Sequence, residues 1–206
     1  MKAKKKAAKA PPKKDSFSPA KIQLRRSSQR SLILGIDNGT SGGIAAIDMH
    51  SGELHGWATL PVNVTGGESR IYPIGLGAAI KALVGTSDFI AVVEVCPMHA
   101  DRADIMRSMG ISFGIIYAAL QFQKCPSPTA IRYVKSGNSK DSWQRRLLSG
   151  GQSLPSGMTK PLALAKAQEL WPDESWIPLH CSTPDTGIID AALIAEFYRT
   201  QTHKPA

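Results

Sequence analysis

The chain has 206 residues, and 42% of them are hydrophobic, which suffices for one domain with a buried core and a tail. No apolar run approaches the ~18 residues that span a membrane, because Asp, Lys or Arg interrupts every long one. The three cysteines, Cys96, Cys125 and Cys181, are far apart and form no CxxC pair, so neither a zinc site nor a disulfide framework is expected.

The net charge of +9 is concentrated at the N-terminus. Residues 1–30 contain 11 Lys/Arg and one acid, a net +10, whereas residues 31–206 contain 14 Lys/Arg and 15 Asp/Glu, a net −1. The segment 1–30 has few large apolar residues, so it is predicted to be a disordered basic tail. Such tails bind polyanions through counterion release, and a solubilising or targeting role is the alternative.

The remaining residues, 31–206, are predicted to form one domain. The apolar pattern predicts five strands, at residues 31–37, 42–48, 54–60, 89–95 and 129–134. Helices are predicted at residues 73–84, 101–122, 139–148, 160–171 and 188–200, with loops at 61–69 and 149–159. Three antiparallel strands followed by strands alternating with helices indicate a mixed five-stranded sheet flanked by helices. This is the order of the ribonuclease H-like α/β fold.

An acid stands at the tip of an apolar strand in the stretch LGIDNGTSGGIAAID, residues 34–48. Asp37 ends the strand and faces a turn rich in Gly, Ser and Thr. Either its carboxylate caps a hairpin, or it holds something positively charged. The turn alone does not decide between the two.

Glu94 is the first candidate partner, because it lies near the end of the apolar strand FIAVVEV. Buried acids are rare unless they are paired or bind a metal. If the first and fourth strands lie side by side, Asp37 and Glu94 end at neighbouring positions. A strand-end salt bridge to a nearby Lys or Arg is the alternative for Glu94.

Two further acids, Asp185 and Asp190, lie in the stretch PDTGIIDAALIAEFY. Asp190 starts a strongly apolar helix, where an inward-facing acid needs a partner. On a continuous helix, a five-residue step turns about 140° away from the same face. The two acids therefore converge only if Asp185 lies in the loop before the helix, where helix capping is its alternative role.

Together the four acids indicate a carboxylate cluster for two divalent cations. Hard cations prefer oxygen ligands, and a few carboxylates usually hold Mg²⁺ together with substrate phosphate. Two such ions about 4 Å apart activate water and stabilise the leaving oxygen of a phosphodiester.

The ordered set of motifs resembles the RuvC family of Holliday junction resolvases over residues 31–200. The motifs are Gly-Ile-Asp-x-Gly at 35–39, the strand-end acid Glu94, and Asp-Ala-Ala-Leu-Ile-Ala at 190–195. Further matches are the helix RSMGISFGIIYAAL (107–120), Trp143, and the pattern Lys160, Ala163, Ala167, Leu170, Pro172. The wide spacing of the last two acids is most similar to the chloroplast resolvase branch.

The resemblance implies a homodimer that cuts two strands of a four-way DNA junction symmetrically, with two Mg²⁺ per site or Mn²⁺ in their place. It implies that Asp37 binds both metals, Glu94 the second, and Asp185 and Asp190 the first. Hydrolysis without a covalent intermediate would leave 5′-phosphate and 3′-hydroxyl ends. The implied location is a chloroplast or other organelle nucleoid, or a bacterial cytoplasm, with no membrane partner.

The sequence departs from the family at two places. Asn38 stands where bacterial members usually have Pro, and their last two acids are closer together than Asp185 and Asp190. Some relatives use His at the earlier position. Because His180 lies nearby, it is an alternative to Asp185 as the third ligand.

Two other functions compete with a nuclease. The stretch GIDNGTSGG also resembles the first phosphate loop of sugar kinases, in which glycine amides cradle phosphates. A kinase of that type needs two such domains, and this chain is short for both. The other alternative is a junction-binding protein without catalysis.

The expected DNA contacts cluster around the fifth strand and the loop 149–159. The candidates are Lys135, Lys140, Arg145, Arg146 and Lys160, with an ordinary solvated helix face as the alternative. The helix at 101–122 carries an apolar stripe and three small residues four apart, Gly110, Gly114 and Ala118. These features indicate a dimer interface, and packing on its own sheet is the alternative.

Overall fold

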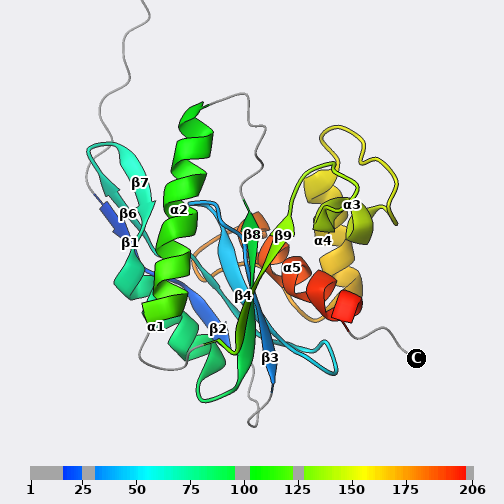
Figure 1. Cartoon of the computed structure of the whole chain (residues 1–206), viewed down its shortest axis with the longest axis horizontal. Coiled ribbons are helices and arrows are strands. Elements are labelled where there is room, and N and C mark those ends of the chain that lie inside the picture. The colour runs from blue at the N-terminus through cyan, green and yellow to red at the C-terminus, as the bar shows by residue number, and fades with distance from the viewer. Residues whose placement is uncertain (1–15, 25–30, 96–102, 123–127, 203–206) are drawn as a thin grey trace, which may run out of the picture.

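The computed structural model describes residues 16–24, 31–95, 103–122 and 128–202. A six-stranded mixed sheet with helices on both faces forms the centre of this part of the chain (Figure 1). In spatial order its strands are β2 (Ile22–Leu24), β5 (Leu54–Thr59), β4 (Gly43–Asp48), β3 (Leu32–Ile36), β8 (Phe89–Val95) and β9 (Ala130–Lys135).

The central strand β3 has a different kind of neighbour on each side. It is antiparallel to β4 and parallel to β8, which in turn is parallel to β9. Strand β5 extends the sheet beyond β4 in the antiparallel sense. This order confirms the predicted ribonuclease H-like arrangement. The sheet has six strands rather than the predicted five, because β2 pairs with the outer edge of β5.

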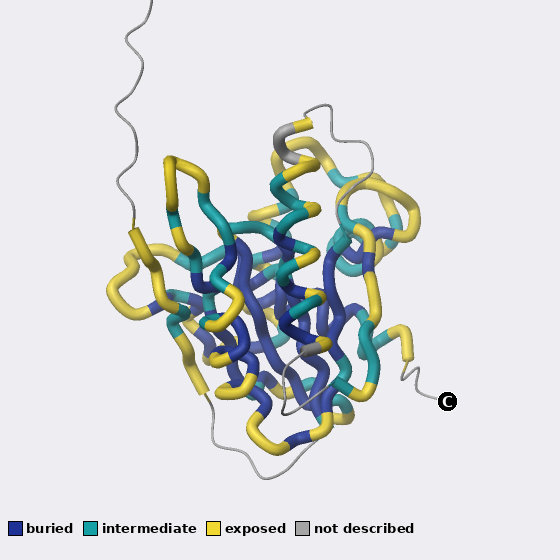
Figure 2. The backbone as a smooth tube through the Cα atoms, turned by 60° about the vertical axis from the view of Figure 1, so that its left-hand side comes forward, coloured by how far each residue is buried: buried dark blue, intermediate teal, exposed yellow. Residues whose placement is uncertain are grey.

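Two helices cover one face of the sheet, and three cover the other (Figure 1). The first pair is α1 (Pro73–Val84) and α2 (Ala103–Phe122), and the second group is α3 (Trp143–Leu148), α4 (Thr159–Leu170) and α5 (Thr186–Thr202). Along β3, Ile33 joins the core beneath α5, whereas Leu34 and Ile36 join the core beneath α1 and α2. Burial on both faces, visible as the dark central strands of Figure 2, explains why these strands are apolar throughout.

Part of the N-terminal segment is folded, which corrects the prediction that residues 1–30 are a disordered tail. Strand β1 (Ser16–Ser18) pairs with a hairpin beside the sheet, and β2 pairs with β5. Both strands are exposed, so their apolar side chains do not enter the core, and backbone pairing with distant segments, which local composition does not reveal, orders them. The prediction is wrong for residues 16–24, and residues 1–15 and 25–30 lie outside the described residues.

The predicted loop at residues 61–69 is a β-hairpin instead. It consists of β6 (Val62–Thr65) and β7 (Glu68–Ile71), which form a small sheet with β1. Its two-residue turn, Gly66 and Gly67, has φ values of 58° and 82°. Two consecutive positive φ angles match the turn that joins tightly twisted hairpin strands, and Gly adopts them without steric cost.

The other predicted strands and helices are present, with shifts at their ends. Helix α3 begins at Trp143 rather than at residue 139, and residues 101–102 of the long predicted helix lie outside the described residues. In the described part of the chain, no helix combines the length and apolar character needed to cross a membrane.

A candidate carboxylate site at the ends of the central strands

Glycines allow helix α5 to pack directly on the β3–β4 hairpin. A Cβ added to Gly35 would lie 2.0 Å from the carbonyl oxygen of Ala191, and one added to Gly43 would lie 2.8 Å from the backbone of Ile188. Neither distance leaves room for a side chain. The close contact brings the first turns of α5 to the ends of the central strands.

Asp37 and Glu94 lie at the ends of neighbouring parallel strands. The register pairs Ile36 with Val93, so the two acids follow at adjacent positions where β3 and β8 end. Asp37 is half-buried, whereas Glu94 is only 8% exposed. The structure therefore brings this pair together, although 57 residues separate them in sequence.

The pKa of Asp37 is raised from 3.8 to about 7. Burial is the largest cause, and the nearby Glu94 carboxylate is the next. The backbone N–H of Gly39 donates to Oδ1 of Asp37 at 3.2 Å and opposes the shift, as Lys160 does, whereas Asp185 adds to it. The hydrogen bond from the Gly39 N–H within the turn is thus present, but its lowering of the Asp37 pKa is smaller than the rise caused by burial and the nearby acids.

The pKa of Asp190, in helix α5, is raised from 3.8 to about 8. Burial is again the first cause, followed by the charges of Asp37 and Glu94, with a smaller contribution from Asp185. Lys160 acts in the opposite direction. Asp190 therefore lies within electrostatic reach of the other three acids, and Asp37 within reach of Glu94 and Asp185.

Asp185 lies in the loop that leads into α5 and caps this helix. Its Oδ1 accepts hydrogen bonds from the backbone N–H groups of Gly187 at 2.9 Å and Ile188 at 3.2 Å. The capping role considered for Asp185 is therefore present. Its Oδ2 accepts no hydrogen bond from a described residue, and its charge still acts on Asp37 and Asp190. His180, by contrast, is exposed in a groove lined by residues of the N-terminal segment.

Glu94 is held by Trp143 at the start of α3. The indole Nε1–H donates to Oε2 of Glu94 at 3.0 Å, and both side chains are buried. Burial raises the pKa of Glu94, while hydrogen bonds from Ser136 and Trp143 lower it. These donors favour the charged carboxylate and fix its direction. No strand-end salt bridge of Glu94 occurs among the described residues.

The four acids are near one another without being assembled as ligands. In the described ranges, no three His, Cys, Asp or Glu side chains approach closely enough to hold one ion. Mutual repulsion between carboxylates favours such separation. The chemistry of the set nevertheless fits a hard divalent cation, because all the donors are oxygens and neighbouring carboxylates add to the burial that raises the pKa of Asp37 and Asp190.

The five basic residues considered for DNA binding fall into two groups, those without and those with a protein partner among the described residues. Lys135, Lys140 and Lys160 are exposed, and Lys160 lies close enough to the acids to affect Asp37 and Asp190. The remaining two have protein partners instead.

Arg145 and Arg146 differ from the three lysines. Arg145 donates through Nε to the carbonyl oxygen of Gly151 at 2.7 Å and through Nη1 to that of Asn138 at 3.2 Å, so it ties two loops together. The guanidinium of Arg146 lies 5.9 Å from the ring centre of Phe197, near the end of α5 remote from Asp190. Arg146 is nevertheless exposed, so it remains open to a polyanion together with Lys135, Lys140 and Lys160, whereas Arg145 is engaged by the two loops.

Residues that support the acids were the main omission from the sequence prediction. Trp143 was recognised as a motif position, but its bond to Glu94 was not, and Ser136 was not considered. A buried Trp needs an acceptor for its N–H, which was the available signal for the first contact. Nothing in the sequence indicated the second.

The glycine turn after Asp37 is used for packing rather than to form a phosphate cradle. An added Cβ at Gly42 would lie 2.2 Å from the Asp37 carbonyl oxygen, and one at Gly187 would lie 2.3 Å from that of Ser41. The turn is thus closed against its own backbone and α5. This contact disfavours the kinase alternative, which needs turn amides open to a nucleotide.

The chain is similar to two solved structures of Thermus thermophilus RuvC. One is 14% identical, with a TM-score of 0.47, and the match covers 83% of this chain and 96% of that chain. The other is RuvC in complex with a Holliday junction substrate, 12% identical, with a TM-score of 0.46, covering 84% of this chain and 96% of that chain. No family model and no curated protein matches the chain.

Proposed function

We propose that this protein is a metal-dependent endonuclease that resolves four-way DNA junctions. The observation that carries the proposal is the convergence of Asp37, Glu94 and Asp190 at one edge of the sheet, where burial raises the pKa of all three and repulsion by neighbouring carboxylates adds to the rise for Asp37 and Asp190. A fold gains no stability from such an arrangement, because each ionised acid disfavours the others. The arrangement is therefore a candidate for a cation site that serves catalysis.

Asp37, Glu94, Asp185 and Asp190 would hold two Mg²⁺ ions. When bound, such ions activate water for attack on phosphorus and stabilise the leaving oxygen of the phosphodiester. The chain prepares this site in three ways. The Trp143 N–H orients Glu94, capping of α5 holds Asp185, and helix–hairpin packing positions Asp190.

The choice of a four-way junction as substrate rests on the RuvC-like motif set in the sequence. Symmetric cleavage of a junction needs two active sites, and we propose that a homodimer through α2 supplies them. Gly110 and Gly114 lie exposed on this helix, and a Cβ at either would meet no atom within 4 Å. A second helix therefore has room to approach there.

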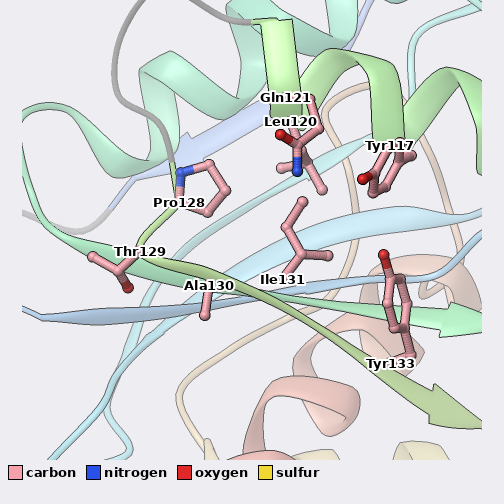
Figure 3. Close-up of a pocket in the computed structure, with 8 residues that line it drawn as sticks. All are labelled: Tyr117, Leu120, Gln121, Pro128, Thr129, Ala130, Ile131 and Tyr133. Atoms are coloured by element: carbon pink, nitrogen blue, oxygen red, sulfur yellow. The ribbon is translucent and has the colours of Figure 1, made fainter.

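An aromatic surface next to these glycines supports the same interface. Tyr117 of α2 and Tyr133 of the edge strand β9 are 43% and 49% exposed. Both line a hollow, and Leu120 and Ile131 line it beside them (Figure 3). Exposed aromatic residues beside apolar ones are typical of the centre of protein interfaces.

Cleavage assays with matched substrates test the proposal. A labelled immobile four-way junction, a nicked duplex and single-stranded DNA would be incubated with the protein in Mg²⁺ or in EDTA. We expect cleavage of the junction in Mg²⁺ only, and its loss in the Asp37→Asn and Glu94→Gln variants with junction binding retained.

The control is Asp88→Asn, which removes an exposed acid immediately before the first residue of strand β8, at the end of the strand remote from Glu94. It should cut at the wild-type rate. Cleavage by Asp37→Asn at that rate would contradict the site. Junction binding without cleavage by the wild type would instead favour a non-catalytic junction-binding protein.

A further inference from the structure

A polar groove opens beside the carboxylate site, between hairpin β6–β7 and the first turns of α2. Its volume is about 250 Å³. It is lined by Thr40, Glu68, Ser69, Arg70, Arg107 and Ser108. Helix α2 contacts strand β7, and the two stand side by side in Figure 1. None of these residues is among the five basic residues that were expected to contact DNA.

The groove and the acids share the turn that follows β3. Thr40, which lines the groove, is three residues from Asp37, and three residues span at most about 11 Å. Between them, the buried Asn38 donates through Nδ2 to the carbonyl oxygen of Met109 at 3.3 Å. This bond ties the turn to α2, so the groove and the acids are parts of one edge.

The groove offers the donors that contact phosphate oxygens. Arg107 is exposed and has no hydrogen bond or ion pair with any other described residue. Thr40, Ser69 and Ser108, which carry hydroxyl groups, line the same groove. Guanidinium and hydroxyl groups are among the donors with which proteins contact the phosphates of a nucleic-acid backbone.

A second guanidinium in the groove is paired with an acid. Nη2 of Arg70 lies 2.5 Å from Oε2 of Glu68, and Nη1 donates to the carbonyl oxygen of Ser69 at 3.2 Å. Both members of the pair remain partly exposed. An anion that enters the groove therefore competes with Glu68 for Arg70, so Glu68 should weaken binding rather than support it.

We propose that this groove binds a backbone phosphate of the DNA strand that enters the carboxylate site. The inference rests on the proposed nuclease function. Each strand of B-form DNA carries one phosphate per about 3.4 Å of helix axis. A phosphate in the groove therefore lies within a few nucleotides of the one at the acids, and it sets the strand's register there.

DNA binding by the full chain tests this subsite apart from cleavage. In the Asp37→Asn background and in EDTA, the Kd for a labelled four-way junction would be measured at several salt concentrations. Arg107→Ala should weaken binding about tenfold, which is the scale of one charge-assisted hydrogen bond. It should also make the salt dependence shallower by about one unit of slope.

Two further variants separate a phosphate contact from a general effect of charge. Lys81→Ala removes an exposed cation of α1, outside the groove, and should leave both quantities nearly unchanged. Glu68→Gln removes the competing carboxylate and should tighten binding several-fold. If the Arg70–Glu68 pair only stabilised the hairpin, the same change would weaken binding.

Equal effects of Arg107→Ala and Lys81→Ala, or weaker binding by Glu68→Gln, would overturn the subsite. The nuclease proposal is judged independently, by cleavage with the wild-type chain. If DNA binds through Arg107 but is never cut, the phosphate subsite is supported and the nuclease proposal is rejected. A wild-type chain that binds no DNA would remove both.

Discussion

Two glycine-rich hairpin turns of this protein use glycine for different reasons. In the β3–β4 turn, an added Cβ at Gly42 would lie 2.2 Å from a backbone oxygen. In the β6–β7 turn, an added Cβ at Gly66 or Gly67 meets nothing within 4 Å, but both residues have positive φ. The first turn is glycine-rich because it is packed, and the second because it is tightly bent.

The difference connects each turn to a part of the proposed function. The packed turn fixes Asp37 relative to helix α5, so its glycines support the acids without touching a substrate. The open turn carries β7, whose Arg70 lines the groove. Rigid support is therefore expected around the acids, and tolerance of change at the tip of the β6–β7 hairpin.

Gly42→Ala should have the largest effect on stability. The new methyl group would collide with the Asp37 carbonyl oxygen, which is backbone and does not move aside cheaply. Overpacking costs about 1–3 kcal/mol and more where the backbone is fixed, so we expect a loss of at least about 3 kcal/mol. Chemical denaturation measures it. Near wild-type stability would mean that the turn is not closed as described.

Removal of residues 1–24 should have the second-largest effect on stability. It deletes β1 and β2, together with the hydrogen bonds from the Lys21 backbone N–H to Thr59 Oγ1 at 2.9 Å and from Gln23 Nε2 to Glu174 Oε1 at 3.1 Å. Each lost bond contributes about 0.5–1.5 kcal/mol, so the unfolding free energy should fall by roughly 2–3 kcal/mol.

Removal of residues 1–15 is the matched control, because it leaves both strands in place. It takes away basic residues, so DNA binding should weaken and its salt dependence become shallower, while preference for a junction over duplex is kept. Equal unfolding free energies of the two truncated proteins would show that strands β1 and β2 do not stabilise the fold.

Asp190→Asn should stabilise the fold in a pH-dependent way. The folded pKa of Asp190, about 8, lies above its ordinary value of 3.8. Stability from this group is therefore fully present below pH 4 and is lost as pH rises through 8. The variant avoids that loss, so its Tm should exceed that of the wild type at pH 8.5, with a smaller difference at pH 5. A Tm difference between the variant and the wild type that is the same at both pH values would contradict ionisation of Asp190 as its cause.

Gly67→Asn should have the smallest effect. Asn tolerates positive φ, and no atom lies near the new side chain, so stability should change by no more than about 0.5 kcal/mol. Gly67→Val keeps the open surroundings but disfavours φ of 82°, and it should cost about 1–2 kcal/mol. A large loss with Asn would show that the tip is packed.

The sequence predicted the main sheet because its signals are local. Apolar runs such as residues 89–95 mark buried strands, and helical spacing marks α1 at its observed ends. The β6–β7 hairpin was missed, although alternation at Val62 and Val64 followed by Gly66-Gly67 carries the pattern of a tight hairpin. Strands β1 and β2 carry no comparable signal, because only pairing with distant strands orders them.

For the site, residue type predicted more than residue position did. The acids were identifiable as unusual, since Asp190 interrupts an apolar helix and Glu94 an apolar strand. Their supporting contacts depend on how distant segments pack, as with Trp143 and Glu94, which lie 49 residues apart. The groove between β7 and α2 has the same origin, so sequence spacing did not reveal it.

The most direct test of the central claim is the effect of a divalent cation on thermal unfolding. Tm would be measured with and without Mg²⁺ at pH 8 for the wild type, Asp37→Asn and the control Asp88→Asn. If the acids form one cation site, Mg²⁺ raises the Tm of the wild type and of Asp88→Asn, but not of Asp37→Asn. An equal rise in all three, or none in the wild type, would contradict the account.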